Sequence, residues 1–259
     1  MGILNVTPDS FSDGGKFFHA EQALEQVQQM ITAGATIIDI GGESTRPGAA
    51  EVSDGDELAR VIPVLKAIKQ RFDVLVSIDT SKASVMQAAI ENGADIINDV
   101  RALQNQGCVD VLAKSDIPIC LMHMQGLPRT MQDKPSYEHV INDIKSFFQQ
   151  RITECVEAGI ARERLILDPG FGFGKTLEQN FHLLANLSEF SALDLPLLVG
   201  ISRKSMIGNL LNRDVEQRLA GSISAAIIAV QQGAHIIRVH DVVETVDALK
   251  ILETVTDNR

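Results

Sequence analysis

The stretch Gly34-Ala35-Thr36-Ile37-Ile38-Asp39 has two close copies further along the chain, Gly93-Ala94-Asp95-Ile96-Ile97-Asn98 and Gly233-Ala234-His235-Ile236-Ile237-Arg238. A glycine that ends a helix, followed by a short β-branched run, is typical of the junction between a helix and the next strand. In each copy a polar residue follows the run, where the strand is expected to end. In barrels of βα units, functional residues collect at the C-terminal ends of the strands. One local pattern therefore predicts both the fold and the place of the functional residues.

The rest of the chain repeats this alternation of strands and helices. Apolar runs predict strands at residues 1–6, 36–40, 74–78, 95–97, 117–122, 165–167, 197–201 and 236–239. Amphipathic stretches predict helices at residues 20–32, 56–70, 82–91, 137–158, 179–190, 213–232 and 243–255. Such alternation indicates a parallel sheet with right-handed crossovers, and eight units in 259 residues favour a closed barrel. We therefore expect an α/β fold, a TIM (β/α)8 barrel, forming a single domain over residues 1–259.

The composition restricts the classes of partner. Hydrophobic residues make up 45% of the chain, but aromatic residues only 4%, so aliphatic side chains must fill the interior. The net charge of -11 argues against a nucleic-acid or anionic-membrane surface. No apolar run reaches membrane-spanning length, and the cysteines are widely spaced without a Cys-x-x-Cys pair. We expect a cytoplasmic protein with reduced thiols and no nucleic-acid or membrane partner.

Polar residues stand at nearly every predicted strand end. In chain order they are Asn5, Asp39, Asp79, Asn98, His123, Asp168, Ser202 with Lys204, and Arg238 with His240. The carboxylates and amides among them suit the donor and acceptor edge of a flat nitrogen heterocycle. The cations, together with Arg46 on a loop, suit phosphate-like oxygens. The pattern predicts a ligand with a polar heterocycle and an anionic tail, whereas for Asp39 and Asp99 a purely structural role stays equally open.

Two further features concern the loops. The connections at residues 7–15 and 41–55 are long for βα turns, which indicates binding loops over the barrel mouth. The run Gly170-Phe171-Gly172-Phe173-Gly174-Lys175 is not a P-loop, because only three residues separate its outer glycines where a P-loop has four. These glycines instead predict close approach of the backbone to a flat ring, with Phe171 or Phe173 packed near it.

Five segments together resemble the dihydropteroate synthase family: Asn-Val-Thr-Pro-Asp-Ser-Phe-Ser-Asp-Gly-Gly at 5–15, Gly-Gly-Glu-Ser-Thr-Arg-Pro-Gly at 41–48, Asp-Pro-Gly-Phe-Gly-Phe-Gly-Lys at 168–175, Ser-Arg-Lys-Ser at 202–205 and Arg-Val-His-Asp at 238–241. The resemblance implies a TIM-barrel transferase of folate biosynthesis that sulfonamides target. Such an enzyme joins 6-hydroxymethyl-7,8-dihydropterin diphosphate to 4-aminobenzoate and releases diphosphate with the help of Mg²⁺. It also implies a homodimer.

The resemblance gives roles to individual residues. It implies pterin binding by Asp79, Asn98, Asp168 and Lys204, diphosphate binding by Arg238 and His240, a contact to the pterin diphosphate by Thr45, positions near the aminobenzoate and phosphate sites for Arg46 and Ser202, and Mg²⁺ ligation by Asn5. In the family, loss of diphosphate leaves a pterin methylene cation, which the arylamine attacks. Electrostatic positioning by Lys204, Arg238 and His240 would then contribute more to catalysis than a strong general base.

Two other functions fit part of the pattern. A methyltetrahydrofolate-binding barrel of a corrinoid methyltransferase would share the pterin acceptors, but it has no need of the cations at 202–204 and 238–240. A non-catalytic pterin-binding paralogue would be expected to lack the loop or metal residues. The one departure from the family pattern is Met1, which falls at the start of the first expected strand, where members usually carry a preceding segment.

Overall fold

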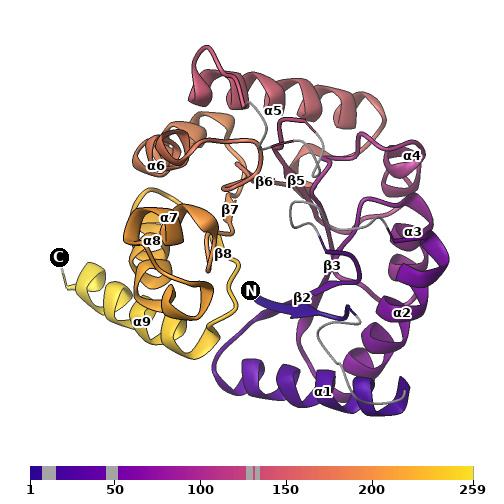
Figure 1. Ribbon diagram of the computed structural model, residues 1–259. Helices are drawn as coiled ribbons and strands as arrows, with labels where there is room; N and C mark the ends of the chain where they lie inside the picture. The colour runs from indigo at the N-terminus through magenta and orange to yellow at the C-terminus, as the bar shows by residue number, and fades with distance from the viewer. Residues whose placement is uncertain (8–15, 45–51, 127–130, 132–134, 259) are drawn as a thin grey trace.

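The computed structural model describes residues 1–7, 16–44, 52–126, 131 and 135–258, with only the backbone described for residues 16–20. Figure 1 shows a closed ring with strands inside and helices outside, which confirms the expected (β/α)8 barrel. Six parallel strands form one sheet and two form a second. The strands are β1 (Gly2–Asn5), β2 (Ile37–Gly41), β3 (Leu75–Asp79), β4 (Ile96–Asp99), β5 (Ile119–Met122), β6 (Leu165–Asp168), β7 (Leu198–Val199) and β8 (Ile236–Ile237).

Isolated backbone bridges join the two sheets into a ring. Leu167 bridges to Leu197 between β6 and β7, and Gly2 bridges to Val239 between β1 and β8. At the second seam Val239 donates its N–H to Met1 O at 2.9 Å and accepts from Ile3 N–H at 3.0 Å. Strands β7 and β8 are shorter than the sequence predicts, because their regular pairing covers only two residues of each.

The three Gly-Ala-x-Ile-Ile stretches form the junctions that the sequence predicts. Gly34, Gly93 and Gly233 all adopt positive φ, at 101°, 87° and 98°. The alanine that follows each glycine donates its N–H to a carbonyl of the preceding helix, at distances of 2.9, 3.0 and 2.9 Å. This left-handed ending satisfies the last carbonyls of the helix and turns the chain back into the barrel. Helix, glycine and strand thus follow one another in the same way at β2, β4 and β8.

Helices surround the barrel in chain order, as Figure 1 shows. They are α1 (Lys16–Thr32), α2 (Asp54–Arg71), α3 (Ala83–Glu91), α4 (Cys108–Leu112), α5 (Val140–Glu157), α6 (Leu177–Ala185), α7 (Ser205–Leu211), α8 (Leu219–Gln231) and α9 (Val242–Asp257). The sequence did not predict α4 and α7, because five and seven residues are too few to reveal a helical period. The expected helix at 213–232 is a 3-10 turn at Val215–Gln217 followed by α8.

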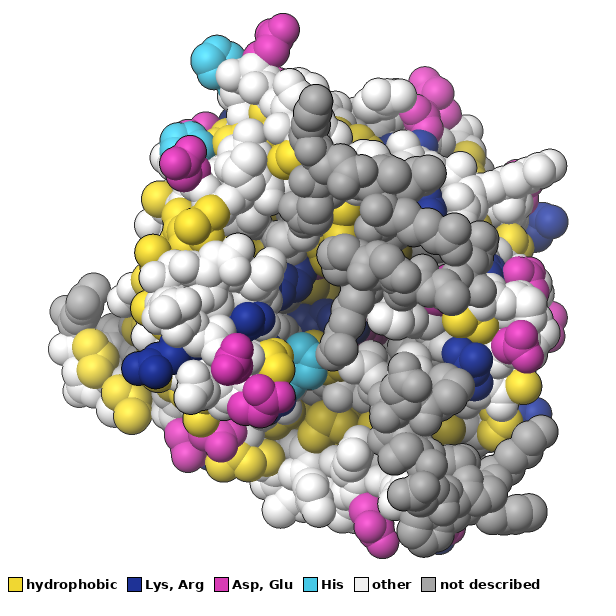
Figure 2. Space-filling model, in the orientation of Figure 1, with side chains coloured by type: hydrophobic (Ala, Val, Ile, Leu, Met, Phe, Trp, Pro, Cys, Tyr) yellow, Lys and Arg dark blue, Asp and Glu magenta, His cyan; other side chains and the backbone are white. Residues whose placement is uncertain are grey.

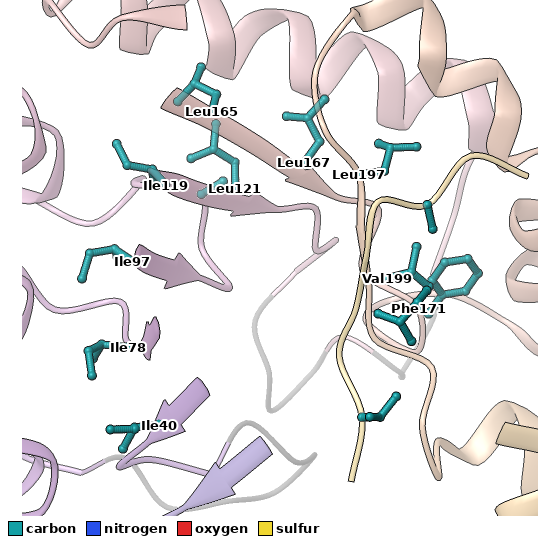
Figure 3. Packing of buried hydrophobic residues seen from close by; sticks show 14 of the residues in the cluster. Ile40, Ile78, Ile97, Ile119, Leu121, Leu165, Leu167, Phe171, Leu197 and Val199 are labelled. Atoms are coloured by element: carbon teal, nitrogen blue, oxygen red, sulfur yellow. The ribbon is translucent and has the colours of Figure 1, made fainter. Parts of the chain in front are cut away.

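Aliphatic side chains fill two separate layers. The larger layer lies between the strands and the helices, and Figure 3 shows Ile40, Ile78 and Ile97 directed outward from consecutive strands into it. The smaller layer consists of Cys120, Ile166 and Leu198, with Met1 and Ile236 packed against them. Because strand residues alternate between two faces, this second set fills the inside of the barrel.

Two further findings concern the helices and the cysteines. No helix in the described ranges is long and apolar enough to cross a membrane. The cysteines Cys108, Cys120 and Cys155 are all buried and form no disulfide.

Candidate active site

A row of inward-facing residues crosses the first four strands at the barrel mouth. The parallel register aligns Asn5 with Gly41, Gly41 with Asp79, and Asp79 with Asn98. Gly41 leaves space in this row, since a Cβ there would lie 3.5 Å from Asn5 Oδ1 and 3.9 Å from Asp79 Oδ2. The structure therefore brings three of the predicted site residues, from β1, β3 and β4, to one level of the rim.

Asp39 lies one step deeper in the barrel and is fully buried. Its Oδ2 accepts hydrogen bonds from Arg238 Nε at 2.6 Å and from Asn98 Nδ2 at 3.3 Å. Its Oδ1 has no partner within the described part of the chain. The sequence left the role of Asp39 open, and the structure places it beneath the site, where it orients two of the predicted binding residues.

Arg238 connects the two parts of the predicted ligand site. Besides Asp39, its guanidinium contacts Asp79, with Nη2 2.9 Å from Asp79 Oδ2. Burial alone would lower the pKa of Arg238, but the two carboxylates outweigh burial and raise that pKa. Burial raises the pKa of Asp79 to about 7, although Arg238 opposes the rise. The two ends of the predicted ligand site therefore meet at these residues, because the cation of one end is paired with a carboxylate of the other.

Asp168 and Lys204 both contact the loop that follows β6 at the barrel mouth. Asp168, at the end of β6, accepts the N–H of Gly170 at 2.8 Å. Lys204 donates to Phe171 O, and its Nζ lies 4.4 Å from the centroid of the Phe173 ring. Burial raises the pKa of Asp168, with Lys204 acting against it, and burial lowers the pKa of Lys204 to about 8, with Asp168 acting against it.

Both phenylalanines of this loop contact Lys204, Phe171 through its backbone carbonyl and Phe173 through its ring. The Phe171 side chain is fully buried in the outer aliphatic layer, so the structure favours Phe173 as the ring that packs beside a bound ligand. Its distance to the Lys204 ammonium is within the range of a cation–π contact.

Ser202 and His240 pair across β7 and β8. Ser202 Oγ accepts the backbone N–H of His240 at 3.2 Å and lies 3.1 Å from His240 Nδ1. The adjacent residues Arg203 and Asp241 form an ion pair, with Arg203 Nε 2.9 Å from Asp241 Oδ2. These contacts fix the two segments that follow β7 and β8 against each other, so the predicted anion-binding residues share one support.

Two residues near the mouth have roles that the sequence did not predict. His123 follows β5, and its Nδ1 lies 3.1 Å from Lys175 Nζ. Burial, reinforced by Lys175, lowers the pKa of His123 well below its ordinary value. The Lys175 ammonium also contacts carbonyl oxygens of its own loop. The glycines around Lys175 indicated an unusual loop in the sequence. Periodicity could not reveal the contact of Lys175 with His123, because the two residues are 52 positions apart.

Asp99 serves the backbone of a turn. Its side chain accepts the N–H groups of Arg101 and Leu103, at 2.8 and 2.7 Å, and the hydroxyl of Ser81. Of the two acidic residues left open by the sequence, Asp99 thus has the structural role. The predicted site residues Thr45 and Arg46 lie outside the described residues.

The face that carries the site is hollowed at its centre. Figure 2 shows Lys and Arg side chains gathered in this hollow, with a His side chain beside them. Among the described residues, no group of three or more His, Cys, Asp or Glu is arranged to hold a metal ion. Asn5 is exposed at the rim beside the space left by Gly41, and an amide oxygen is a suitable ligand for Mg²⁺. Asn5 could therefore contribute one oxygen ligand to a magnesium ion at this rim.

Comparisons with known proteins agree with this arrangement. Residues 1–240 match the family described as pterin binding enzyme. The dihydropteroate synthase of Escherichia coli K12 is 58% identical over 253 residues, which cover 98% of this chain and 90% of that protein. The dihydropteroate synthase of Haemophilus influenzae is 56% identical over 251 residues, covering 97% of this chain and 91% of that protein.

Solved structures extend the similarity to three dimensions. The Yersinia pestis dihydropteroate synthase in a sulfonamide drug complex is 59% identical, with a TM-score of 0.95 over 99% of this chain and 94% of that one. The Xanthomonas albilineans enzyme with 4-aminobenzoic acid is 47% identical, with a TM-score of 0.93 over 99% and 92% of the two chains. The chain belongs to the pterin binding enzymes and, among these, to the dihydropteroate synthases, which are transferases.

Proposed function

We propose that this barrel, as one pterin-binding domain over residues 1–259, converts 6-hydroxymethyl-7,8-dihydropterin diphosphate and 4-aminobenzoate into 7,8-dihydropteroate and diphosphate. The observation that carries the proposal is the meeting of buried acceptors with partly buried cations at one barrel mouth, where Arg238 bonds to Asp39 and Asp79 while Lys204 lies beside Asp168. A heterocycle with a diphosphate tail needs both kinds of group at adjacent positions.

The pterin ring would be bound by Asp79, Asn98 and Asp168. The ring edge offers N–H donors and carbonyl or ring-nitrogen acceptors, which carboxylates and an amide match. All three side chains are buried or nearly so, and a polar group in such a site loses its hydration unless the ligand replaces it. This cost makes the pocket selective for a ring with the matching donor pattern. Lys204 would contact the ring from the side of Phe173.

The diphosphate would be bound by Arg238, His240 and Ser202, with Thr45 contacting the same substrate. Arg238 and His240 are two residues apart and project from the same side of an extended segment. Negative charge grows on the bridging oxygen as the C–O bond to diphosphate breaks, so donors aimed at that oxygen stabilise the transition state more than the bound substrate. Asp39 would keep the Arg238 guanidinium oriented through its 2.6 Å contact.

Asn5 would contribute one oxygen ligand to Mg²⁺ bound with the diphosphate. When bound, the ion neutralises charge on the leaving phosphate oxygens. The exposed Asn5 amide and the space at Gly41 support this assignment.

The second substrate would then attack the electron-poor methylene carbon left on the pterin. The arylamine nitrogen forms the new C–N bond and afterwards loses a proton to solvent, so the site needs no strong general base. Arg46 and Ser202 would lie near the aminobenzoate and phosphate sites. The presence of 4-aminobenzoic acid in the Xanthomonas albilineans enzyme and of a sulfonamide in the Yersinia pestis enzyme supports binding of both kinds of ligand here.

We also propose that the protein is cytoplasmic and forms a homodimer through α7, α8 and α9. Exposed apolar side chains gather on these helices: Leu210, Leu211, Ile228, Val243, Ile251 and Val255. The three helices lie side by side in Figure 1, and hydrophobic side chains appear over them in Figure 2. An apolar patch of this kind is typical of an interface between subunits.

Sedimentation of the wild type and of Ile251→Glu tests the proposed dimer. A wild-type monomer, or a variant dimer of unchanged affinity, would contradict the proposal.

The activity is tested by a product assay with both substrates and Mg²⁺. We expect dihydropteroate and diphosphate in equal amounts, with no product when either substrate is omitted. Loss of activity in chelator, restored by added Mg²⁺, would support the metal assignment, and full activity in chelator would contradict it. Binding of methyltetrahydrofolate without any synthase activity would instead indicate the methyltransferase function.

A further inference from the structure

The loop that follows β6 is held in place by side chains from its surroundings. Asn180 of α6 is buried, and its Oδ1 accepts the N–H of Gly172 at 2.7 Å. The Asn180 amide donates in turn to Lys175 O at 3.2 Å and to Thr176 O at 2.8 Å. Tyr137 OH donates to Gly174 O at 2.8 Å. A loop of three glycines would otherwise be among the least restricted segments of the chain, so these contacts have to fix its course.

Lys175 holds the same loop from beneath. Its side chain is only 2% exposed, and its Nζ donates to Gly170 O at 2.8 Å and to Phe173 O at 3.1 Å. The third neighbour of Nζ is His123 Nδ1 at 3.1 Å. An ammonium has three N–H donors: two have carbonyl acceptors here, and His123 Nδ1 accepts the third in the tautomer that carries its proton on Nε2. A buried lysine in this setting fixes both ends of the loop relative to β5.

The loops that follow β5 and β6 pack directly against each other, backbone to backbone. A Cβ on Gly170 would come within 1.9 Å of His123 O, and one on Gly174 within 2.5 Å of Gln125 O. Both glycines have positive φ, at 70° and 59°. A displacement of this loop therefore requires a displacement of the segment that contains His123, unless the Lys175 contacts break.

This loop in turn determines the position of Lys204. The Lys204 ammonium donates to Phe171 O and lies over the Phe173 ring. A Cβ on Gly172 would lie 3.1 Å from Lys204 Cδ, so the side chain runs directly over the loop backbone. The loop begins at Asp168, whose carboxylate accepts the N–H of Gly170. Two proposed pterin-binding residues thus have their geometry set by the backbone that Lys175 holds.

We propose that Lys175 is a positioning residue for the transfer reaction, which acts through the loop at residues 170–174 to hold Lys204 and Asp168 in the geometry that binds the pterin. This inference rests on the proposed role of Lys204 and Asp168 at the pterin ring. Lys175 does not contact the substrate in this proposal. Its three contacts are to His123 and to the loop, and its effect is transmitted by Phe171 O and by the Phe173 ring.

Lys175→Met tests the proposal because it keeps the length of the side chain and removes all three donors. We expect the KM for the pterin diphosphate to rise and the affinity for the free pterin to fall, each by at least about tenfold, the scale of one or two lost hydrogen bonds. A side chain that only stabilised the fold would lower the amount of active protein and hence the apparent kcat, while the KM of the folded fraction stayed unchanged.

Arg164→Met is the matched control at the opposite end of β6. Arg164 is also a cation that donates to backbone carbonyls, those of Leu112 and Ile117, each at 2.9 Å. It precedes β6, whereas Lys175 follows it, so its loss should lower the melting temperature without changing the KM by more than about twofold. A rise in KM in this control equal to that in Lys175→Met would overturn the proposal.

Asn180→Ala provides a second route to the same loop without a change of charge. We expect it to raise the KM for the pterin diphosphate in the same direction as Lys175→Met. If Lys175→Met does not fold, the Asn180→Ala result decides alone. Unchanged KM and pterin affinity in either folded variant contradicts the proposal. Loss of pterin binding in Asp168→Ala alongside such a result would leave the proposed function intact and remove only the role of Lys175.

Discussion

The inside of the barrel has two levels with opposite chemistry, although they are only two residues apart along the same strands. On β6, Ile166 belongs to the inner aliphatic layer, while Asp168 is a buried carboxylate of the site. On β8, Ile236 packs against the same layer, and Arg238 follows at the mouth. Residues two apart on a strand share a face. On each of these strands, one inward-facing residue therefore packs in the core and the next inward-facing residue belongs to the site.

The lower level stabilises the fold and the upper level costs stability. Burial of Ile166 and Leu198 removes apolar surface from water, the main favourable term in folding. At the upper level, burial raises the pKa values of Asp79 and Asp168, which indicates that their charged forms are poorly solvated without a ligand. Substitutions at the two levels should therefore have different effects, with stability lost below and binding or catalysis lost above.

The largest effect is expected at Arg238. Arg238→Ala should cost about 2–4 kcal/mol of transition-state stabilisation, because one preorganised donor to the developing charge is removed. The measurement is kcat/KM for the pterin diphosphate, beside titration with the free pterin. Ile236→Ala on the same strand should lower stability and leave kcat/KM nearly unchanged.

Titration with the free pterin shows whether Arg238 serves the diphosphate or only the ring pocket. Arg238→Ala should weaken its binding less than that of the diphosphate ester, since the direct ring contacts lie with other residues. Equal losses for the two ligands, with kcat retained, would show that Arg238 serves only the ring pocket through Asp79.

The next effect is expected at Asp168. Asp168→Ala should weaken pterin binding by roughly 1–3 kcal/mol or more, because the ring loses an acceptor in a buried site. Calorimetric titration gives the affinity, and circular dichroism checks the fold. Asp79→Ala should behave alike. Ile166→Ala should instead lower the free energy of unfolding by about 2–5 kcal/mol and leave the pterin affinity of the folded protein intact. Unchanged affinity in folded Asp168→Ala would remove that carboxylate from the site.

A smaller effect is expected in the pH dependence of stability. The pKa of Asp79 is raised to about 7 in the folded protein, mainly by burial, from an ordinary value of 3.8. Between these values the folded state binds more protons than the unfolded state, so the contribution of Asp79 to stability is present at low pH and is lost as the pH rises toward 7. Chemical denaturation should therefore give a stability difference between Asp79→Asn and wild type that grows in favour of the variant from pH 4 to 7, by at most about 1.4 kcal/mol per pH unit. A constant difference would contradict the raised pKa.

The smallest effect concerns the order of binding. We expect 4-aminobenzoate to bind at least about tenfold more tightly when diphosphate and Mg²⁺, or the pterin substrate, are already present, because the site for the arylamine then includes a bound anion. Titration of 4-aminobenzoate with and without diphosphate measures the coupling. Equal affinity under both conditions would show that the arylamine site is complete in the free protein.

The sequence predicted the levels of the barrel better than the contacts within them. Alternation and strand ends located Asp79, Asn98, Asp168 and Arg238, because facing depends only on local periodicity. The ion pair of Arg238 with Asp39 could not be predicted, since it joins residues 199 positions apart and depends on the side-chain conformation of arginine. Helix α4 was missed for the opposite reason, because its five residues contain too little periodicity.

Closure of the ring has a consequence for how the protein folds. The acceptors stand on the six-stranded sheet and the cations follow the two strands of the second sheet, which bridges to the first at Leu167 and at Gly2. The bridge between Gly2 and Val239 joins the two ends of the barrel, and contacts so distant in sequence are slow to form. In a refolding chain we therefore expect the return of activity to follow the joining of the first strand to the last, later than the formation of the helices.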